Sequence, residues 1–450
     1  MNTFFHSVRL DREKCKGCIN CIKRCPTEAI RVRDGKAMII PERCIDCGEC
    51  IRVCTHHAKK ATYDHLDVLR QYEYTIALPA PALYAQFNHL EDVEIVLNAL
   101  LEIGFDAVFE VAKAAEIVSD ATRRYMAQPG IPKPIISSAC PAVTRLIRVR
   151  FPNLIDQILP LNAPVEVAAR IAREEAVQKT GLPPEKIGTV FISPCPAKVT
   201  AAKMPLGSSH SEVSAVVAIS DVYPRLLKAM HTDGEVSPLA APQAGKIGVS
   251  WASSSGEASA LLNDNYLAAD GIENVIRVLE DLEDEKFEHL DFIELNACNA
   301  GCIGGVLTVE NPYIARTKLK RLRKYLPVSL NHASCPEQKH LKWDAPLEYA
   351  PVMKLDEDFA AAMEKMSEME RIEASLPGLD CGSCGAPTCR ALAEDVVRGS
   401  ASPDACIYKF RESISSLIDN LQKLNNCIPS TLRGSSSVEE THSKKGGELK

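Results

Sequence analysis

The sequence lacks the features that would place the chain in a membrane, outside the cell or on nucleic acid. No stretch of about 18 consecutive apolar residues occurs, so no membrane-spanning helix is expected. The opening stretch MNTFFHSVRLDREKCKGC contains no apolar core long enough for a signal peptide. Basic residues are not in excess, because 52 Lys and Arg face 59 Asp and Glu, and a net charge of −7 disfavours nucleic acid as the main partner. We therefore expect a cytoplasmic protein, in a compartment where thiols stay reduced.

Cysteine is the residue that the sequence has in unusual number. The 450 residues suffice for two or three domains, and the 46% hydrophobic and 25% charged content is ordinary for a globular protein. The 18 cysteines are not ordinary, and in a reducing compartment they indicate metal ligands or catalytic thiols rather than disulfides. Sixteen of them fall into three groups, and the other two, Cys335 and Cys427, are interpreted as structural or incidental.

Eight cysteines near the N-terminus form two copies of one spacing. CKGCINCIKRCP and CIDCGECIRVC both follow C-x2-C-x2-C-x3-C, with Thr55 in place of the proline after the second copy. This is the spacing of bacterial two-cluster ferredoxins, in which the fourth cysteine of each run ligates the other cluster. The alternative is two zinc sites, because C-x2-C pairs also bind zinc. We assign one 4Fe–4S cluster to Cys15, Cys18, Cys21 and Cys54 and the other to Cys25, Cys44, Cys47 and Cys50.

The same N-terminal region carries a local excess of positive charge. Residues 1–70 contain 14 Lys and Arg against 9 Asp and Glu. One interpretation is a solvated face, and the other is a docking surface for an acidic electron carrier such as a ferredoxin.

From residue 74 to about residue 349, β-branched runs alternate with amphipathic helices. EDVEIVLNALLEIG and VEVAARIAREEAVQKTG have apolar residues at helical spacing. IGTVFIS, SAVVAIS, KIGVSWAS and HLDFIELNAC have the pattern of strands. Alternating strands and helices predict parallel sheets in an α/β domain.

Four further cysteines lie where such a fold would place a site. Cys140, Cys195 and Cys298 each follow a predicted strand, and Cys302 comes one helical turn later in CNAGCIGG. Ligands of open α/β sheets gather at the carboxyl ends of strands, so these four thiols are placed to converge on one cluster. The alternative is four buried cysteines that pack as small hydrophobic residues.

The segments around these cysteines resemble the three signature loops of iron-only hydrogenases. SSACP, SPCPAKVTAAK and ELNACNAGCIGG are similar, in this order, to the family forms TSCCP, MPCxxKxxE and ExMxCxxGCxxGG, and LPAPALY is similar to a further segment near the active centre. The resemblance extends from residue 1 to about residue 350. It implies an H-cluster, which is a 4Fe–4S cubane joined through a cysteine sulfur to a two-iron unit that carries CO, CN⁻ and a dithiolate.

The resemblance also implies roles for individual residues. Lys198 matches the lysine that contacts a cyanide of the two-iron unit through a charge-assisted hydrogen bond, although a lysine alone would be interpreted as a surface residue. Pro81 and Ala82 match neighbours of that unit, and Cys302 matches the bridging cysteine. The positions that match the cubane ligands are Cys140, Cys195, Cys298 and Cys302.

Four positions depart from the family pattern. Ala139 stands where the family has a proton-donating cysteine, and Ala201 stands where it has the glutamate of the second loop. Ser193 and Asn296 replace two methionines next to the cluster. A positioned acid contributes about 10²–10⁴-fold to a rate, and no replacement acid is evident in the motif loops. The pattern is therefore similar to the sensory branch of the family, which implies low turnover.

Four cysteines form a third group near the C-terminus. The segment LPGLDCGSCGAPTCRALAEDVVRGSASPDAC has the spacing C-x2-C-x4-C-x16-C and resembles the single-cluster module of membrane electron-transport and CO dehydrogenase subunits. The resemblance implies a third accessory 4Fe–4S cluster, and a zinc site is the alternative. The predicted ligands are Cys381, Cys384, Cys389 and Cys406.

Together these observations predict four regions. We expect an α+β two-cluster domain over 1–70, an α/β H-cluster domain over 71–355, a helical linker with a single-cluster module over 356–410, and a helix with a disordered tail over 411–450.

The predicted function is a hydrogen or redox sensor that reacts with H2 and protons at low turnover. No Walker loop or histidine-kinase-like segment is evident, so a signal would pass through a partner. The resemblance also implies maturation enzymes that build the two-iron unit, and a homodimer is allowed. One alternative is a non-catalytic electron-transfer or cluster-assembly protein that lacks the two-iron unit. The other is an ordinary hydrogenase with a rerouted proton path.

Overall fold

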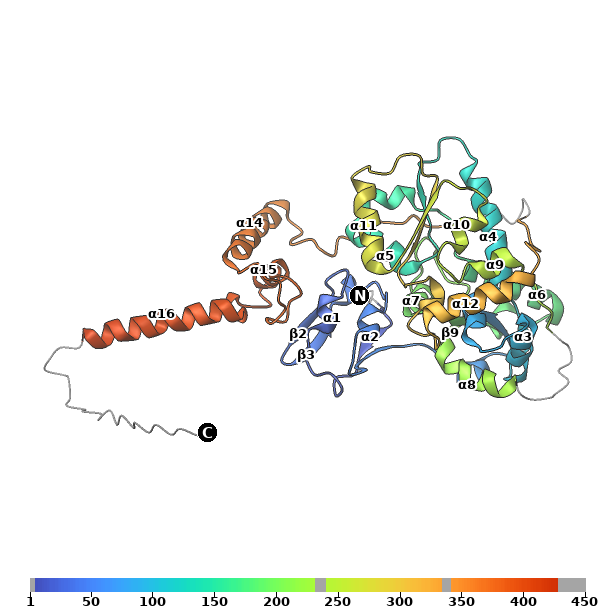
Figure 1. Ribbon diagram of the computed structural model, residues 1–450, viewed down its shortest axis with the longest axis horizontal. Coiled ribbons are helices and arrows are strands. Elements are labelled where there is room, and N and C mark those ends of the chain that lie inside the picture. The colour runs from blue at the N-terminus through green and yellow to red at the C-terminus, as the bar shows by residue number, and fades with distance from the viewer. Residues whose placement is uncertain (1–4, 231–239, 334–340, 428–450) are drawn as a thin grey trace, which may run out of the picture. The chain divides into compact units, whose positions relative to one another are not determined.

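The computed structural model describes residues 5–230, 240–333 and 341–427 (Figure 1). The chain divides into two compact units: the larger runs to residue 357 and takes in 385–387, and the smaller contains the rest of the C-terminal part. Cys335 and the predicted disordered tail beyond residue 427 lie outside the described residues. In the described ranges no helix is both long and apolar enough to cross a membrane.

The first part of the larger unit is built from two similar halves. Strand β1 (Val8–Leu10) pairs antiparallel with β4 (Lys59–Ala61), and β2 (Ile30–Arg33) pairs antiparallel with β3 (Lys36–Ile39). Each cysteine run contributes one short helix, α1 (Asn20–Lys23) or α2 (Glu49–Arg52). The small core between these elements contains cysteine side chains together with Val8, Ile22 and Ile30.

The remainder of the larger unit contains two parallel sheets. The first has the order β6 (Ala107–Val108), β5 (Tyr74–Pro79), β8 (Ile187–Ser193) and β9 (Ala215–Ala218). The second has the order β10 (Tyr266–Asp270), β11 (Phe292–Asn296) and β7 (Ile135–Ile136). The prediction of parallel sheets is confirmed. Strand β8 is buried along its whole length, as a central parallel strand requires.

Helices connect and cover these sheets (Figure 1). The helices before β8 are α3 (Val93–Glu102), α4 (Val111–Met126), α5 (Pro141–Arg150) and α6 (Pro164–Thr180). Those after β8 are α7 (Pro196–Lys203), α8 (Ile219–Ala229), α9 (Lys246–Ser250), α10 (Gly256–Ala260), α11 (Ile272–Glu283) and α12 (Pro312–Leu322).

One predicted strand is wrong, because KIGVSWAS forms α9 and the turn after it. Its first amides bond outside the helix, with Lys246 N donating to Pro327 O at 2.7 Å and Ile247 N donating to Val328 O at 3.0 Å. A Cβ atom on Gly248 would collide with the carbonyl oxygen of Ala112 on α4. Close packing of α9 on α4 therefore overrides the β-branched pattern of the segment.

The smaller unit consists of helices around the third cysteine group. These are α14 (Phe359–Ser375), α15 (Cys389–Val397) and α16 (Ile407–Asn426). Asp358 caps α14 by accepting from Ala361 N, and Thr388 caps α15 by accepting from Ala391 N.

A buried hydrogen-bond network fixes the N-terminal part onto α7. Asp46, on the second cysteine run, accepts from Ser7 N and Val8 N at 3.0 Å each, and Thr200 of α7 donates its hydroxyl to the other oxygen of Asp46 at 2.7 Å. Ser7 Oγ donates to Pro196 O at 2.7 Å. Since α7 also carries Cys195 at its N-cap and Lys198 in its first turns, this network positions two predicted site residues.

The substitution Thr200→Val tests this network. It keeps the side-chain volume but leaves a buried carboxylate oxygen without its hydroxyl donor, so we expect the free energy of unfolding to fall by about 1–3 kcal/mol. Denaturant titration of the anaerobic protein measures the change. Thr62→Val, at an exposed position, is the matched control and should stay within about 0.5 kcal/mol. Equal effects of both substitutions would contradict the importance of the network.

Candidate functional site

The four central cysteines lie in loops that follow parallel strands. Cys140 follows β7 and is the N-cap of α5, and Cys195 follows β8 and is the N-cap of α7. Cys298 follows β11, and Cys302 begins a short 3-10 helix that ends at Gly304. The carboxyl ends of strands from both sheets thus bring three loops together.

These four cysteines lie close enough for a charge on one of them to shift the pKa of another. Burial raises the pKa of Cys195 to about 11, and the nearby Cys140 raises it further. Burial raises the pKa of Cys302 to about 12, with Cys195 and Cys140 as neighbours, and raises that of Cys298 well above its usual range. The thiols of Cys195, Cys298 and Cys302 are therefore held neutral, and coordination to iron would have to replace their protons.

The spacing of the sulfur atoms disfavours a single metal ion. A tetrahedral zinc site with Zn–S bonds near 2.3 Å brings its sulfurs to roughly 3.8 Å from one another. Among the described residues, the one group of three candidate ligand atoms that all lie within 4.8 Å is His6, Cys44 and Asp46. No described trio of cysteines is that close. The wider spacing favours multi-iron clusters over zinc.

The N-terminal cysteines come together across the two runs. Burial raises the pKa of Cys21 to about 11, and its electrostatic neighbours are Lys59, Cys18, Cys15 and Cys54. Cys50 has Cys44 and Cys25 among its charged neighbours, and Cys47 has Cys25 and Cys50. The fourth cysteine of each run therefore lies with the first three of the other, in the grouping that the spacing predicts, although the ligand roles stay predictions.

Backbone amides point at several of these sulfurs in matching positions. Ala29 N donates to Cys25 Sγ at 3.2 Å and Ala58 N donates to Cys54 Sγ at 3.2 Å, each from four residues further along the chain. Hydrogen bonds to thiolate sulfur are one of the means by which proteins tune the potential of an iron–sulfur cluster.

The third cysteine group lies within the smaller unit. Cys389 is the first residue of α15, and its amide donates to Asp380 Oδ1 at 2.6 Å. Cys406 is buried just before α16, Cys384 is half-buried and Cys381 is exposed. Gly382 has a φ of +76°, so the loop between the first two cysteines turns through a conformation that favours glycine.

Cys302 and Lys198 line one small apolar cavity of about 60 Å³. Lys198 Nζ donates to Ala139 O at 3.2 Å. Of the predicted neighbours of the two-iron unit, Pro81, Ala82, Ala139 and Asn296 line this cavity. Ser193 does not line it; its hydroxyl donates to Cys195 O at 3.0 Å and accepts from Cys195 N, which fixes the Cys195 loop.

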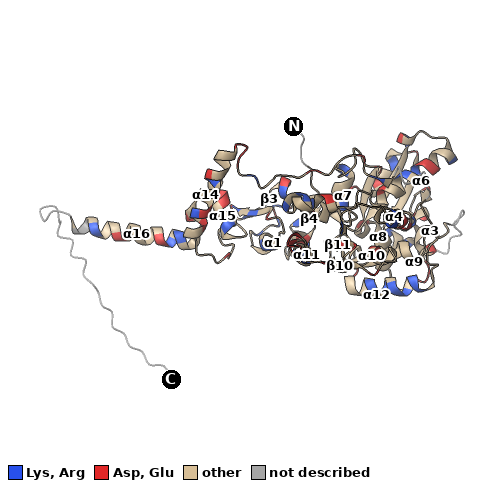
Figure 2. Ribbon diagram, turned by 90° about the horizontal axis from the view of Figure 1, so that it is seen from above, with Lys and Arg blue, Asp and Glu red and all other residues tan. Residues whose placement is uncertain are grey.

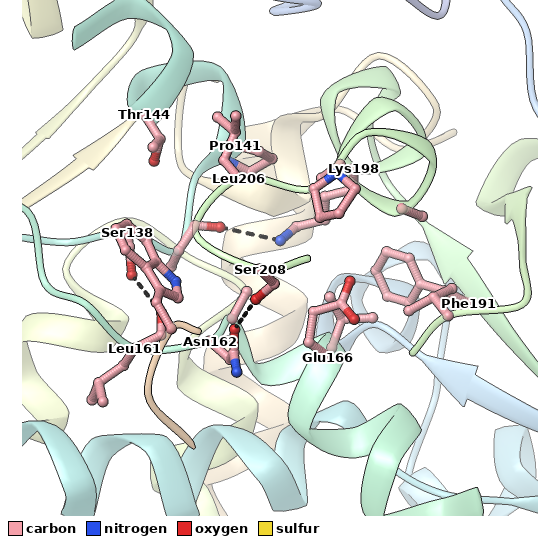
Figure 3. A pocket seen from close by; sticks show the side chains of 18 residues that line it. Ser138, Pro141, Thr144, Leu161, Asn162, Glu166, Phe191, Lys198, Leu206 and Ser208 are labelled. Atoms are coloured by element: carbon pink, nitrogen blue, oxygen red, sulfur yellow. Dashed lines mark hydrogen bonds between the residues drawn. The ribbon is translucent and has the colours of Figure 1, made fainter. Parts of the chain in front are cut away.

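A second cavity of about 60 Å³ shares Ala139 and Lys198 with the Cys302 cavity (Figure 3). It is lined by Ala139 and Ala201, the two positions where the family has acids, and by Lys198. Glu166 of α6 also lines it and accepts from Ser211 Oγ at 2.7 Å and from Glu212 N at 2.8 Å. Burial raises the pKa of Glu166.

Two acids that the sequence analysis missed line the Cys302 cavity, namely Glu257 of α10 and Glu294 of β11. They are 5% and 3% exposed. Burial raises the pKa of both, and the charge of Glu294 raises that of Glu257 further. A buried carboxyl pair of this kind favours holding one proton between its members near neutral pH.

Ser137 connects this pair to the position of the missing donor. Its hydroxyl donates to Glu257 Oε2 at 2.6 Å and accepts from Ala139 N at 3.1 Å. Asn296 Nδ2 donates to Glu294 Oε1 at 2.7 Å. Asn296, predicted only as a neighbour of the cluster, thus orients an acid.

The structure places Glu294, the first residue of the third motif loop ELNACNAGCIGG, in the wall of the Cys302 cavity, where the sequence analysis found no evident replacement acid. Its use as a proton donor is a proposal. The available signal was a charged residue within an otherwise apolar strand, because unpaired acids are almost never fully buried. Glu257 lies outside the motifs, and only the folded chain brings it to the site.

Three family models match parts of the chain. The model "Iron only hydrogenase large subunit, C-terminal domain" matches residues 73–262 and 248–306, which together cover more than half of the 450 residues. The model "4Fe-4S dicluster domain" matches residues 7–55, and the model "Putative Fe-S cluster" matches residues 376–408.

Curated relatives with this architecture include two hydrogenases. The chain is 24% identical over 265 residues to the NADP-reducing hydrogenase subunit HndD of Solidesulfovibrio fructosivorans, which is 50% of this chain and 45% of that protein. It is 23% identical over 392 residues to iron hydrogenase 1 of Clostridium pasteurianum, which is 70% of this chain and 68% of that protein. The chain thus spans about half the length of the first of these relatives.

Solved structures similar to the chain include an FeFe-hydrogenase from Chlamydomonas reinhardtii. The TM-score is 0.47 at 14% identity, and the match covers 62% of this chain and 95% of that chain.

The interlocked N-terminal grouping predicts the outcome of single cysteine replacements. Cys54→Ser should remove a ligand of the cluster that Cys15, Cys18 and Cys21 begin, with loss of up to about four iron atoms per chain. Iron and sulfide analysis after anaerobic reconstitution measures the loss. Cys427→Ser, at an exposed position outside all three groups, is the control and should leave the iron content unchanged. The assignment is contradicted if both variants keep the full iron content.

Proposed function

The chain belongs to the iron-only hydrogenase family, and we propose that it is a hydrogen-responsive member with low turnover that acts as a hydrogen or redox sensor. It is an iron–sulfur oxidoreductase related to these enzymes. The observation that carries the proposal is the Cys302 cavity, in which a bridging thiol, a lysine and a buried carboxyl pair meet next to an alanine at the donor position.

The residues around the Cys302 cavity fit an H-cluster. Cys140, Cys195, Cys298 and Cys302 are the proposed cubane ligands, and Cys302 opens into the cavity where a two-iron unit would be held. Small apolar residues, including Pro81 and Ala82, line the cavity. When bound, that group supplies the chemistry that interconverts H2 with protons and electrons.

Lys198 supplies the charge in this otherwise apolar site. Its position on α7 brings the ammonium group beside the Ala139 carbonyl, on the wall of the same cavity as Cys302. A cation in a water-poor site binds an anionic cyanide ligand strongly, because charge-assisted hydrogen bonds gain strength where water does not compete. Lys198 has this use only if the two-iron unit is present, which favours the hydrogenase-like function over a cluster-assembly protein.

The proton path at this site must differ from the path at a site where a cysteine occupies the position of Ala139 and donates the proton. The side chain of Ala139 has no proton to give, and the carboxyl groups that line the same cavity are those of Glu257 and Glu294. We propose that this pair stores the proton, and that Ser137 orients Glu257 toward the donor position.

Electrons would enter through the N-terminal cysteine groups. Arg52 of α2 donates to Gly304 O at 2.9 Å, two residues beyond Cys302. A Cβ atom on Gly48 would touch Val306 and Pro196, so the second cysteine run packs directly on the loops of the central site. We propose that the N-terminal clusters relay electrons between the central site and a redox carrier, with an acidic ferredoxin as the expected class.

Infrared spectroscopy of the anaerobically matured protein tests the proposed function. We expect bands in the CO and CN⁻ stretching region under argon, and shifts of those bands under H2. Protein with filled cubanes but without such bands would instead be a non-catalytic electron-transfer or cluster-assembly protein.

The substitution Ala139→Cys restores the missing donor. Because Ala139 lines the Cys302 cavity, we expect the thiol to reach that cavity and to raise H2 turnover by about tenfold or more. Methyl-viologen assays in both directions measure the rate. Wild-type turnover that already equals that of the bulk hydrogen producers would contradict the sensory proposal.

The substitution Glu257→Gln removes one member of the carboxyl pair but keeps its shape. We expect the residual turnover to fall by about tenfold or more, while the infrared bands of the assembled cluster persist. Glu166→Gln is the matched control, since Glu166 is a half-buried acid near Lys198 that does not line the Cys302 cavity. A greater loss in Glu166→Gln would place the proton path in the second cavity, which Glu166 lines.

A further inference from the structure

A large cavity lies outside the predicted metal sites, between α9, α10 and α12. Its volume is about 630 Å³, which is within the range of small-molecule sites. Five serines line it, and three of them are consecutive in the sequence WASSSGEASA. The serines are Ser250, Ser253, Ser254, Ser255 and Ser259.

The charged residues that line this cavity are all cations. They are Lys246 of α9, Arg316 and Lys320 of α12, and Arg323 just after α12. No acidic side chain lines the cavity within the described ranges. Figure 2 shows Lys and Arg along α12. The whole chain has a net charge of −7. A cavity lined by four cations and by no described acid therefore differs in charge from the chain as a whole.

The donors available in the cavity are side chains. The amides of the serine loop are already used, because Ser254 N donates to Ala300 O at 3.0 Å and Ser255 N donates to Glu294 Oε1 at 2.9 Å. Arg323 Nη1 donates to Ser250 Oγ at 2.9 Å, which fixes one guanidinium at the serine wall. Hydroxyl and guanidinium donors on facing walls are the groups that bind phosphoryl oxygens.

Apolar side chains also line the cavity. They are Ile247, Leu262, Leu319 and Val328, of which Leu319 is 1% exposed and Leu262 and Val328 are 75% and 67% exposed. Such side chains can cover the organic part of a ligand while the cations bind its charge.

We propose that this cavity binds a small phosphate-bearing anion, held by the four cations and by the hydroxyls of Ser254 and Ser255, because Ser250 Oγ already donates to Lys246 O and Ser253 Oγ to Ser250 O. The cavity walls include the serine loop, which also holds Glu294 through Ser255 N, so the ligand would lie directly behind the carboxyl pair of the central site. This binding is independent of the two-iron unit and goes beyond the proposed function.

Isothermal titration calorimetry of the full chain, with filled cubanes and without maturation, tests this proposal. The probes are pyrophosphate and ADP at physiological salt. The double variant Arg316→Ala/Lys320→Ala removes two lining cations, and Arg321→Ala/Lys324→Ala removes the same charge from the same segment but outside the lining. We expect binding of at least one probe, weakened about tenfold or more in the lining variant and unchanged in the control.

The outcomes separate the possible ligands. Tighter binding of ADP than of pyrophosphate would show that the apolar lining residues contact the organic part of the ligand. Equal binding of the two probes would show that the site recognises the phosphoryl groups alone. The proposal is overturned if neither probe binds, or if both double variants weaken binding equally, because general surface charge would then account for it. The proposal is also overturned if neither small probe binds, an acidic ferredoxin added as a third probe does bind, and the Arg316→Ala/Lys320→Ala variant loses that binding.

A separate observation concerns α16, whose apolar residues repeat every three and four positions. Six of them follow a strict heptad, and all are at least 40% exposed. They are Ile407, Phe410, Ile414, Leu417, Leu421 and Leu424. A helix of 20 residues with an exposed apolar stripe is marginal in water by itself, so a partner is expected to cover the stripe.

The pattern identifies a second copy of this chain as the partner. In heptad notation, the a positions are Ile407, Ile414 and Leu421, and the d positions are Phe410, Leu417 and Leu424. Isoleucine at two of the a positions and leucine at two of the d positions favour a parallel two-stranded coiled coil. The flanking positions of the stripe include Arg411, Ser413 and Asn420, so equal copies would not place like charges against one another. We infer that α16 forms a parallel coiled-coil dimer that begins directly after Cys406.

Sedimentation analysis of the full chain tests the coiled coil. We expect a dimer for the wild type and a monomer for Leu417→Glu/Leu421→Glu, with the iron content of both proteins equal. Ser415→Glu/Ser416→Glu adds the same charge on the other face of the helix and should remain dimeric. A monomeric wild type, or equal dissociation by both double variants, would overturn the inference.

Discussion

The account depends on desolvation at the point where three strand-end loops meet. Four cysteines, one lysine and two glutamates gather there in surroundings that exclude most water. Burial there raises the pKa of the Cys302 thiol and of the Glu257 and Glu294 carboxyls. Removing a proton from any of these groups therefore costs more free energy than it does in water. Thiols of this kind are suited to binding metal rather than to reacting as free nucleophiles, and carboxyls of this kind are suited to holding a proton.

The same constraint explains why the N-terminal part packs so closely on the central loops. Asp46, which is 1% exposed, is satisfied by the amides of Ser7 and Val8 and by the hydroxyl of Thr200. A buried carboxylate of this kind is stable only with its full set of donors, so the network sets the position of α7. Since α7 presents Cys195 and Lys198, the packing of the N-terminal part bears directly on the geometry of the central site.

Local spacing allowed much of the site to be predicted from the sequence. The N-terminal and C-terminal cysteine groups follow from local spacing, the central cysteines and Lys198 follow from the resemblance of their loops to a known family, and the parallel sheets follow from alternating patterns. Glu257 could not be predicted in this way, because it reaches the Cys302 cavity only through packing of α10 against β11. KIGVSWAS was mistaken for a strand because its close contact with α4 is a tertiary effect. The cationic cavity likewise joins segments about 60 residues apart in the sequence.

The central claim is that the cavity between Cys302 and Lys198 is built to hold a two-iron unit beside an alanine. Crystallography of the anaerobically matured protein at the iron absorption edge tests this claim most directly. The account predicts anomalous density for a cubane among Cys140, Cys195, Cys298 and Cys302, and for two further iron atoms beyond the Cys302 sulfur, facing Lys198. A filled cubane with only water in the adjoining cavity would contradict it.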